Sequence, residues 1–227
     1  MYVVCDAEAC ERAGWTLVDF ASAAIDGGAR FLQVRAKHAS ARSLLDATTA
    51  IVARARAAGA LVVVNDRADV ARAAGAGGVH VGQDDLAPGL VRLVAGADIL
   101  VGISTHTMEQ LESALAEPVS YIAVGPVFAT NTKATGHEQV GLAHVERARA
   151  RVARERAPLP IVAIGGITLE RAVDVIRAGA TSVAVISDLL STGHPAARVG
   201  QYLAALRSAE GTERTEATGT EDAEATD

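Results

Sequence analysis

Eight short apolar segments rich in β-branched residues recur along the chain and alternate with segments of helical pattern. The expected strands are residues 2–5, 31–35, 61–65, 78–82, 98–104, 121–125, 161–165 and 182–187. The expected helices are residues 15–27, 40–57, 68–75, 87–95, 107–117, 141–156, 168–178 and 195–207. This alternation is typical of βαβ units and a parallel sheet. Eight such units in 227 residues predict an α/β single-domain (β/α)8 TIM barrel.

The alternative fold is an open doubly wound sheet of the flavodoxin or Rossmann type. Glycine follows many of the expected strands rather than the first alone, and no G-x-G-x-x-G pattern follows residues 2–5. Half of the residues are hydrophobic but only 3% are aromatic, so small aliphatic side chains must fill the interior. That composition suits strands that helices cover on both faces, and the closed barrel is the favoured prediction.

The negative charge of the chain lies at its C-terminal end. Residues 209–227 hold seven acidic side chains and one basic one, which accounts for the whole net charge of −6. They contain no large apolar residue, so we expect residues 1–208 to form the catalytic barrel and 209–227 a disordered acidic tail. The balanced charge of residues 1–208 argues against a nucleic-acid partner.

No apolar run approaches the roughly 20 residues that a membrane span needs. The first residues lack the pattern of a secretory signal, so a soluble, cytoplasmic protein is expected. Cys5 and Cys10 are too few and too close for a zinc site, and we expect both to be reduced and structural. A homo-oligomer is possible, but the sequence does not decide the oligomeric state.

Polar residues follow nearly every expected strand, at the end where (β/α)8 barrels build their active sites. Gln33, Arg35 and Lys37 share one side of their strand because side chains alternate with a period of two. Two cations beside an amide suit a diphosphate group. The alternative is a solvated strand end with two surface cations.

Carboxylates follow the next two strands. Asn65 and Asp66 end one of them, and Asp84 and Asp85 follow the other. They could cap the helices that follow, or they could bind Mg2+, which takes carboxylate, phosphate and water oxygens. His80 lies between two valines, which favours a packed, hydrogen-bonded core histidine over a catalytic one.

Further hydroxyl groups and glycines mark the remaining strand ends. Ser104 could cap a helix or donate to a phosphate, and the long connection 125–141 is typical of a lid or binding loop. Gly165 and Gly166, followed after the last strand by Ser187, suit a phosphate site formed by the last two loops.

Taken together, these segments resemble the thiamine-phosphate synthase family from Tyr2 to about residue 207. The motifs that carry the resemblance are residues 33–37, 65–67, 78–85, 102–107, 125–133 and 163–167. The resemblance implies an enzyme that joins an aminopyrimidine methyl diphosphate to a thiazole phosphate and releases pyrophosphate. Its two partners are small phosphorylated substrates, its cofactor is Mg2+, and its reaction passes through a dissociative, carbocation-like state.

The resemblance also assigns roles by matched position. Asp66 and Asp85 are the expected Mg2+ ligands, and the expected catalytic residues are Arg35, Lys37, Ser104 and Lys133. The expected contacts of the pyrimidine diphosphate are Gln33, Val34, Arg35, Ala36, Lys37, Asn65, Ser104 and Lys133. Those of the thiazole phosphate are Thr130, Asn131, Thr132, Gly166, Ile186 and Ser187. Ala36 stands where the family usually has glutamate, and alternation turns it away from its neighbours, so we expect only a missing supporting contact.

Two other functions fit parts of the pattern. A thiazole tautomerase on the same barrel needs the thiazole phosphate site but no full magnesium-diphosphate site. A non-catalytic protein that binds thiamine phosphates is the third possibility, supported only by Ala36. The synthase is favoured by the presence of Asp66, Asp85, Arg35, Lys37 and Lys133.

Overall fold

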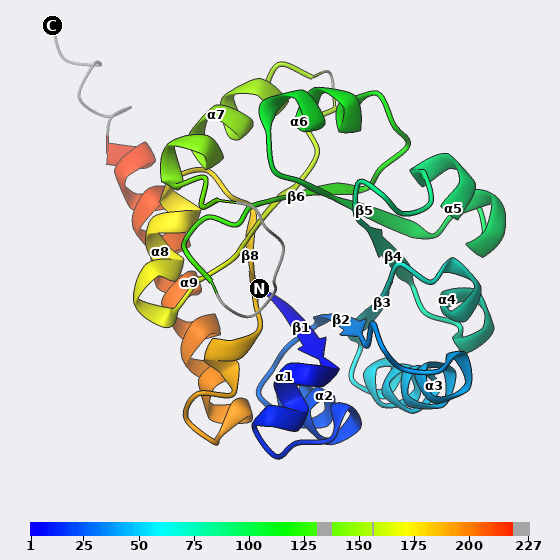
Figure 1. Cartoon of the computed structure of the whole chain (residues 1–227). Helices are drawn as coiled ribbons and strands as arrows, with labels where there is room; N and C mark the ends of the chain where they lie inside the picture. Colours follow the sequence, from blue (N-terminus) through cyan, green and yellow to red (C-terminus); the bar gives the residue numbers. More distant parts are fainter. Residues whose placement is uncertain (131–137, 156, 220–227) are drawn as a thin grey trace, which may run out of the picture.

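The strands of the protein close into a barrel. The structure is a computed structural model and describes residues 1–130, 138–155 and 157–219. The strands are parallel and follow one another around the barrel in chain order, and β8 pairs with β1 to close it (Figure 1). The predicted (β/α)8 barrel is therefore confirmed, and the open sheet is excluded because it would leave both edge strands unpaired.

The strands match the predicted segments closely. They are β1 (Tyr2–Asp6), β2 (Phe31–Arg35), β3 (Leu61–Asn65), β4 (Gly78–Val81), β5 (Leu100–Thr105), β6 (Tyr121–Val124), β7 (Ile161–Ile164) and β8 (Ser182–Val185). The helices are α1 (Ala7–Arg12), α2 (Leu17–Asp26), α3 (Ala41–Ala57), α4 (Ala68–Ala74), α5 (Pro88–Ala95), α6 (Met108–Leu115), α7 (Leu142–Val152), α8 (Leu169–Arg177) and α9 (Pro195–Gly219), with a 3-10 turn η1 (Ser187–Leu189). The helices surround the barrel (Figure 1).

Two short elements were not predicted. Helix α1 follows β1 directly, and the buried Asp6 side chain caps it by accepting a hydrogen bond from the Ala9 amide at 2.9 Å. The turn η1 follows β8 at the mouth of the barrel. Both are too short to show a helical period in the sequence, which is why pattern reasoning missed them.

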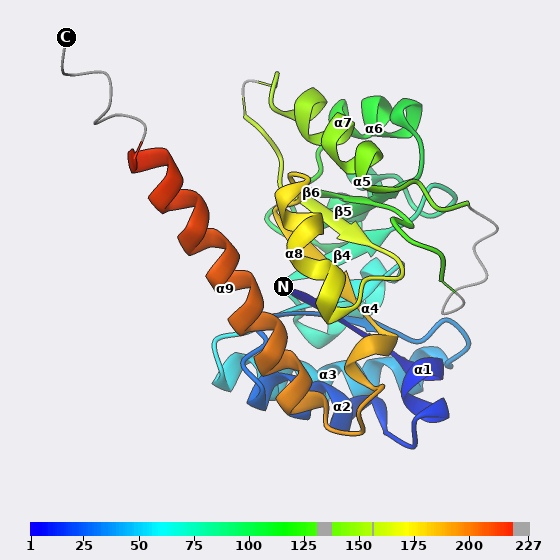
Figure 2. The ribbon, with the colours of Figure 1, turned by 90° about the vertical axis from the view of Figure 1, so that its left-hand side faces the viewer.

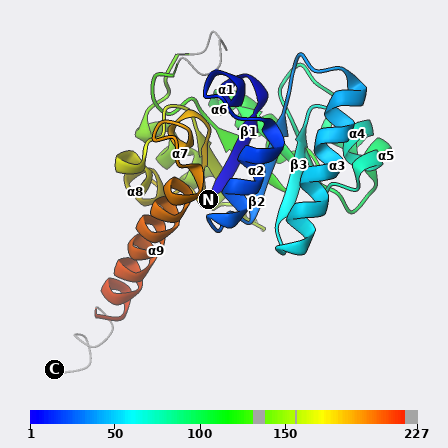
Figure 3. The same ribbon diagram turned by 90° about the horizontal axis from the view of Figure 1, so that it is seen from below.

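The last helix is longer than predicted. Helix α9 packs against α2 and α8 and closes the ring of helices. It continues to Gly219, beyond the domain boundary predicted after residue 208. Figures 2 and 3 show its C-terminal half extending away from the barrel. The acidic residues after 219 lie outside the described residues, and the independence of the tail from the barrel stays a prediction.

Aromatic rings fill the barrel interior although the chain has few of them. Tyr2 stacks on Phe31 with ring centroids 4.2 Å apart, and Tyr121 meets both rings edge-on. A side chain at Gly102 would collide with the Tyr121 ring, because its Cβ would lie 2.0 Å from that ring's Cζ. Glycine at this position of β5 therefore makes the room that the ring occupies.

Two further expectations concern cysteines and membranes. Cys5 and Cys10 are free and buried, as expected for structural thiols. Burial raises the pKa of the Cys10 thiol to about 12 and that of Cys5 well above its usual value, so neither is a ready nucleophile. Within the described ranges, no helix has both the length and the apolar character needed to cross a bilayer.

Candidate active site

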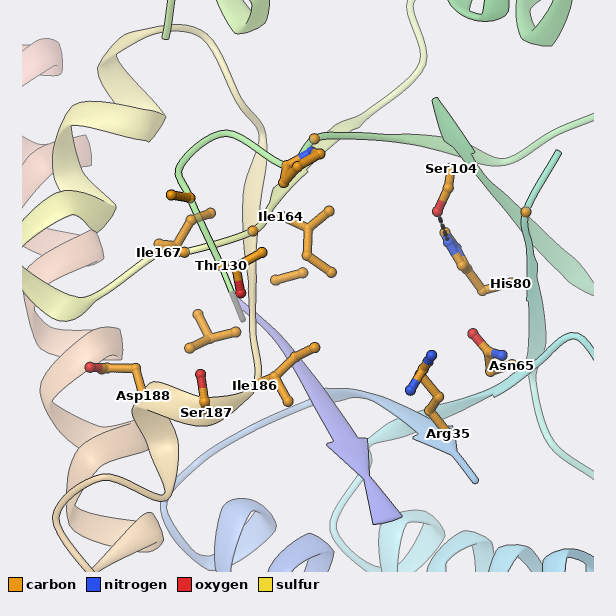
Figure 4. A pocket seen from close by; sticks show the side chains of 18 of the residues that line it. Arg35, Asn65, His80, Ser104, Thr130, Ile164, Ile167, Ile186, Ser187 and Asp188 are labelled. Carbon is orange, nitrogen blue, oxygen red and sulfur yellow. Dashed lines mark hydrogen bonds between the residues drawn. The ribbon is translucent and has the colours of Figure 1, made fainter. Parts of the chain in front are cut away.

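A cavity of about 680 Å³ opens at the carboxyl ends of the strands (Figure 4). Among the predicted site residues, those that line it are Arg35, Lys37, Asn65, Asp66, Asp85, Ser104, Thr130, Gly166, Ile186 and Ser187. These residues come from loops far apart in the chain, and barrel closure brings them to one rim. Asn131, Thr132 and Lys133 lie outside the described residues.

Three predicted contacts do not line the cavity. Gln33 is buried below it, inside the barrel, with 3% of its surface exposed. Val34 is fully buried, and Ala36 packs against the hydrophobic core. Side-chain alternation along β2 explains why Val34 and Ala36 do not reach the cavity, because it sends them to the opposite side from Arg35 and Lys37.

One side of the cavity carries two cations. The guanidinium of Arg35 donates to Asp6 Oδ2, a carboxylate that is only 2% exposed. Lys37 Nζ lies 3.6 Å from Asp66 Oδ2. Sequence reasoning missed Asp6, since the strand β1 was expected to end at residue 5. The Asp6 carboxylate fixes Arg35 in place while also capping α1.

Asp66 and Asp85 form a carboxylate pair beside these cations. Burial and the neighbouring Asp85 raise the pKa of Asp66, while Lys37 and Arg35 oppose the shift. Asp66 has φ of 63°, and among the described residues it is the one non-glycine residue with positive φ. Such backbone strain in a short polar residue is typical of functional sites.

The capping alternative is not what the structure shows. Neither α4 nor α5 has a side-chain hydrogen bond at its N-cap, and the N-cap residues are Arg67 and Ala87. Thr107, rather than Ser104, caps α6. Asp85 instead accepts from the Gly82 amide at 2.7 Å, which holds its loop. The carboxylates and the serine hydroxyl are therefore available to the cavity.

The carboxylate pair fits a magnesium ion that shares its ligands with a substrate. No cluster of three or more acidic, histidine or cysteine side chains forms in the described part of the chain. Mg2+ needs only one or two carboxylates when phosphate oxygens and water complete its octahedron. Burial, and after it the neighbouring Asp85, raise the pKa of Asp66, and a bound cation would offset both effects by stabilising the ionised pair.

A chain of hydrogen bonds runs through the barrel interior to the cavity. Its members, in order, are Gln33 Nε2, the hydroxyls of Tyr2 and Tyr121, His80 Nδ1 and Nε2, and Ser104 Oγ, with successive distances of 2.8, 2.9, 2.9 and 2.8 Å. Burial raises the pKa values of both tyrosines, so both stay protonated.

Gln33 Nε2 donates to the Tyr2 hydroxyl. The other contacts of the chain join hydroxyl groups and ring nitrogens, which can each donate or accept a hydrogen bond. The chain ties Ser104, at the rim of the cavity, to groups inside the barrel. Sequence reasoning missed Tyr2 and Tyr121. The pattern that could have revealed them is a tyrosine at the first position of two strands in a chain with few aromatic residues.

The opposite side of the cavity is built from backbone. Gly165 and Gly166 both have positive φ, and a Cβ at Gly166 would lie 2.5 Å from the carbonyl oxygen of Ala129. Arg171 lies over the Phe128 ring at 4.7 Å and donates to the Gly166 carbonyl at 3.1 Å. Arg171 also lines the cavity and was not predicted, because it belongs to the amphipathic pattern of α8.

The fold and the site define a class of protein. A (β/α)8 barrel with paired carboxylates and cations facing a glycine-bordered pocket across one cavity is an enzyme built for phosphorylated small molecules. The chain belongs to the family described as thiamine monophosphate synthase, whose family model matches residues 1–189. It is accordingly a transferase.

Two relatives and one solved structure agree with this family assignment. The thiamine-phosphate synthase of Koribacter versatilis is 45% identical over 210 residues, covering 92% of this chain and 96% of that protein. That of Anaeromyxobacter dehalogenans is 47% identical over 188 residues, covering 83% and 82%. The solved thiamine phosphate pyrophosphorylase from Pyrococcus furiosus has a TM-score of 0.81 at 26% identity, covering 92% of this chain and 95% of its own.

Proposed function

We propose that this enzyme joins an aminopyrimidine methyl diphosphate to a thiazole phosphate, giving thiamine phosphate and pyrophosphate. The observation that carries the proposal is the pairing of two anion-binding halves across one cavity. The diphosphate half is defined by Arg35, Lys37, Asn65, Asp66, Asp85 and Ser104; the thiazole phosphate half by Thr130, Gly166, Ile186 and Ser187. Two facing anion sites suit the joining of two phosphorylated molecules.

The diphosphate half would assist the departure of pyrophosphate. The bond between the pyrimidine methylene carbon and the diphosphate oxygen breaks, and the oxygen keeps the electron pair. Asp66 and Asp85 would hold Mg2+, which would supply positive charge to stabilise the departing pyrophosphate. Arg35 and Lys37 add fixed positive charge at the same place, which lowers the barrier to ionisation.

Ser104 is suited to donate a hydrogen bond to this substrate. The contact with His80 Nε2 holds the serine hydroxyl at the rim of the cavity. Asn65 lies on the same rim and offers an amide. Lys133, which lies outside the described residues, stays part of the proposal as a further cation.

The thiazole phosphate half would hold the second substrate by its phosphate. Gly166 permits close approach of the backbone, and Thr130 and Ser187 offer hydroxyl groups. Asn131 and Thr132 keep their predicted roles there. The thiazole nitrogen attacks the pyrimidine methylene with its lone pair, and since it carries no proton to lose, the step needs no general base.

The tautomerase alternative explains less of the site. It would use the thiazole phosphate half but would leave Asp66, Asp85, Arg35 and Lys37 without a role. A non-catalytic binding protein would need neither the carboxylate pair nor the strained backbone of Asp66. A soluble enzyme of the cytoplasm, without nucleic-acid or membrane partners, remains our expectation.

The experiment is a product assay. Purified protein with Mg2+ and both substrates should form thiamine phosphate, separated by chromatography, and equal amounts of pyrophosphate, measured with a coupled enzyme. Omission of either substrate, or chelation of Mg2+, should abolish both products. Failure to form thiamine phosphate would overturn the proposal, and aromatisation of a thiazole precursor without pyrimidine would support the tautomerase instead.

A further inference from the structure

A carboxylate stands at the edge of the half of the cavity that would bind the thiazole phosphate. Asp188 follows Ser187 directly within η1, and both line the cavity (Figure 4). An ionised aspartate in the lining of this cavity would repel a phosphate dianion bound there, because like charges repel more strongly where water screens them less.

Two side chains of α9 engage this carboxylate. Arg198 donates from Nε to Asp188 Oδ2 at 3.0 Å and from Nη2 to Asp188 Oδ1 at 3.2 Å. Tyr202 donates its hydroxyl to Asp188 Oδ2 at 2.6 Å. The side chains of Arg198 and Asp188 are only 13% and 14% exposed, so water screens their pairing weakly. The two-point contact is the geometry in which arginine binds carboxylates best.

The same tyrosine reaches the other loop of the phosphate half. Its hydroxyl lies 3.3 Å from the carbonyl oxygen of Ile167, next to Gly166. Tyr202 is fully buried, so its position is set by the packing of α9. One helix outside the strand-to-helix loops therefore contacts both loops that would hold the phosphate. Of the nearby acidic groups, Glu170 lies 3.7 Å from Arg198 but is largely exposed.

We propose that Arg198 is a positioning residue for the thiazole phosphate: it neutralises Asp188 at the edge of the site and, with Tyr202, joins the two phosphate-binding loops. This inference rests on the proposed function. It predicts that the damage caused by losing Arg198 comes from the uncompensated charge of Asp188, so that removing the carboxylate as well restores substrate binding. An ion pair that only stabilises the fold predicts instead equal changes in KM for both substrates.

The test is a double-mutant cycle with Arg198→Gln, Asp188→Asn and the double variant. Arg198→Gln should raise KM for the thiazole phosphate by about ten-fold, which corresponds to ~1.4 kcal/mol, while KM for the pyrimidine diphosphate stays within about two-fold. The double variant should return most of the way to the wild-type KM. Arg177→Gln is the matched control, since Arg177 pairs with Asp174 in an exposed position on α8.

The outcomes separate the two explanations. Equal increases in both KM values, or a double variant as impaired as Arg198→Gln, would overturn the proposal. Thermal denaturation identifies variants that fail to fold, and Arg198→Lys, which keeps the charge but loses the fork, should retain most of the thiazole phosphate affinity.

A binding measurement keeps this inference separate from the proposed reaction. Titration with inorganic phosphate, followed by calorimetry, should show weaker binding to Arg198→Gln than to the wild type and recovery in the double variant. Unchanged phosphate binding in Arg198→Gln would overturn the inference even if the enzyme forms thiamine phosphate. If phosphate binding follows the expected pattern but no thiamine phosphate forms, the role of Arg198 is supported and the proposed reaction is overturned.

Discussion

The Nε2 atom of His80 lies 2.8 Å from the Oγ atom of Ser104. The histidine is 7% exposed and also contacts the Tyr121 hydroxyl, so the prediction of a packed, hydrogen-bonded histidine is confirmed. The same contact makes His80 the support of a serine that faces the cavity. Tyr121, which does not line the cavity, therefore supports through His80 a serine that does.

Breaking this chain in the middle should cost stability, and removing its end should cost activity. Tyr121→Phe leaves His80 Nδ1 and the Tyr2 hydroxyl without one partner inside the barrel, so the free energy of unfolding should fall by about 1–3 kcal/mol. Urea denaturation measures this. Ser104→Ala, at the rim of the cavity, should lose less stability than Tyr121→Phe, and its kcat should fall further below that of the wild type. Equal stability of Tyr121→Phe and wild type would show that these hydrogen bonds do not stabilise the barrel.

Asp66→Asn should abolish Mg2+-dependent turnover without destabilising the metal-free protein. Burial and the neighbouring Asp85 raise the pKa of Asp66 in the folded protein. The stability that the protonated side chain contributes is therefore fully present below pH 3.8, the ordinary pKa of the group, and is lost as the pH rises through the raised pKa of the folded state. At neutral pH the ionised carboxylate is thus unfavourable until a cation binds. Thermal denaturation with and without Mg2+ tests this.

Asp84→Asn is the control for that experiment. Asp84 is an exposed neighbour of Asp85 and does not line the cavity. It should keep both turnover and the stabilisation by Mg2+. A large loss of metal-free stability in Asp66→Asn would show that the carboxylate serves the fold instead.

Gly166→Ala should impair the thiazole phosphate half. The new Cβ would meet the Ala129 carbonyl at 2.5 Å and the Phe128 Cβ at 2.8 Å. Gly193→Ala is a matched control, because Gly193 has a similar positive φ with nothing within 4 Å of the added carbon. We expect Gly166→Ala to lose at least about 1 kcal/mol more stability than Gly193→Ala. Its KM for the thiazole phosphate should rise, and a KM equal to that of the control would refute the assignment.

His144 should make the protein sensitive to mild acid. Its side chain is buried in α7, its Nε2 has no hydrogen-bond partner among the described residues, and burial lowers its pKa from 6.5. Because the pKa of His144 is lower in the folded protein, the stability that the neutral imidazole contributes is present above pH 6.5. It is lost as the pH falls through the lowered pKa of the folded state. Urea denaturation at several pH values should show a smaller acid-side loss for His144→Leu than for the exposed control His194→Gln.

The sequence by itself determined the barrel and the strand ends that form its mouth. Alternation of short β-branched runs with helical segments is a local pattern, and all eight predicted strands are present with ends shifted by a residue or two. Because parallel strands carry their catalytic residues at the carboxyl ends, the strand ends led to predicted site residues of which most, within the described part of the chain, line the cavity. Side-chain alternation likewise separated Arg35 and Lys37 from Ala36.

Only the tertiary structure decided which distant residues support those at the mouth. The pairing of Asp6 with Arg35 and the hydrogen bonds from Tyr2 through Tyr121 to Ser104 join strands that are far apart in the chain. The engagement of Asp188 by α9 joins nearer residues, across the turn that precedes this helix. None leaves a local pattern, because each depends on strand register, on closure of β8 against β1, and on where α9 packs. Periodicity reports which way a side chain points, whereas its partner is fixed only when the barrel closes.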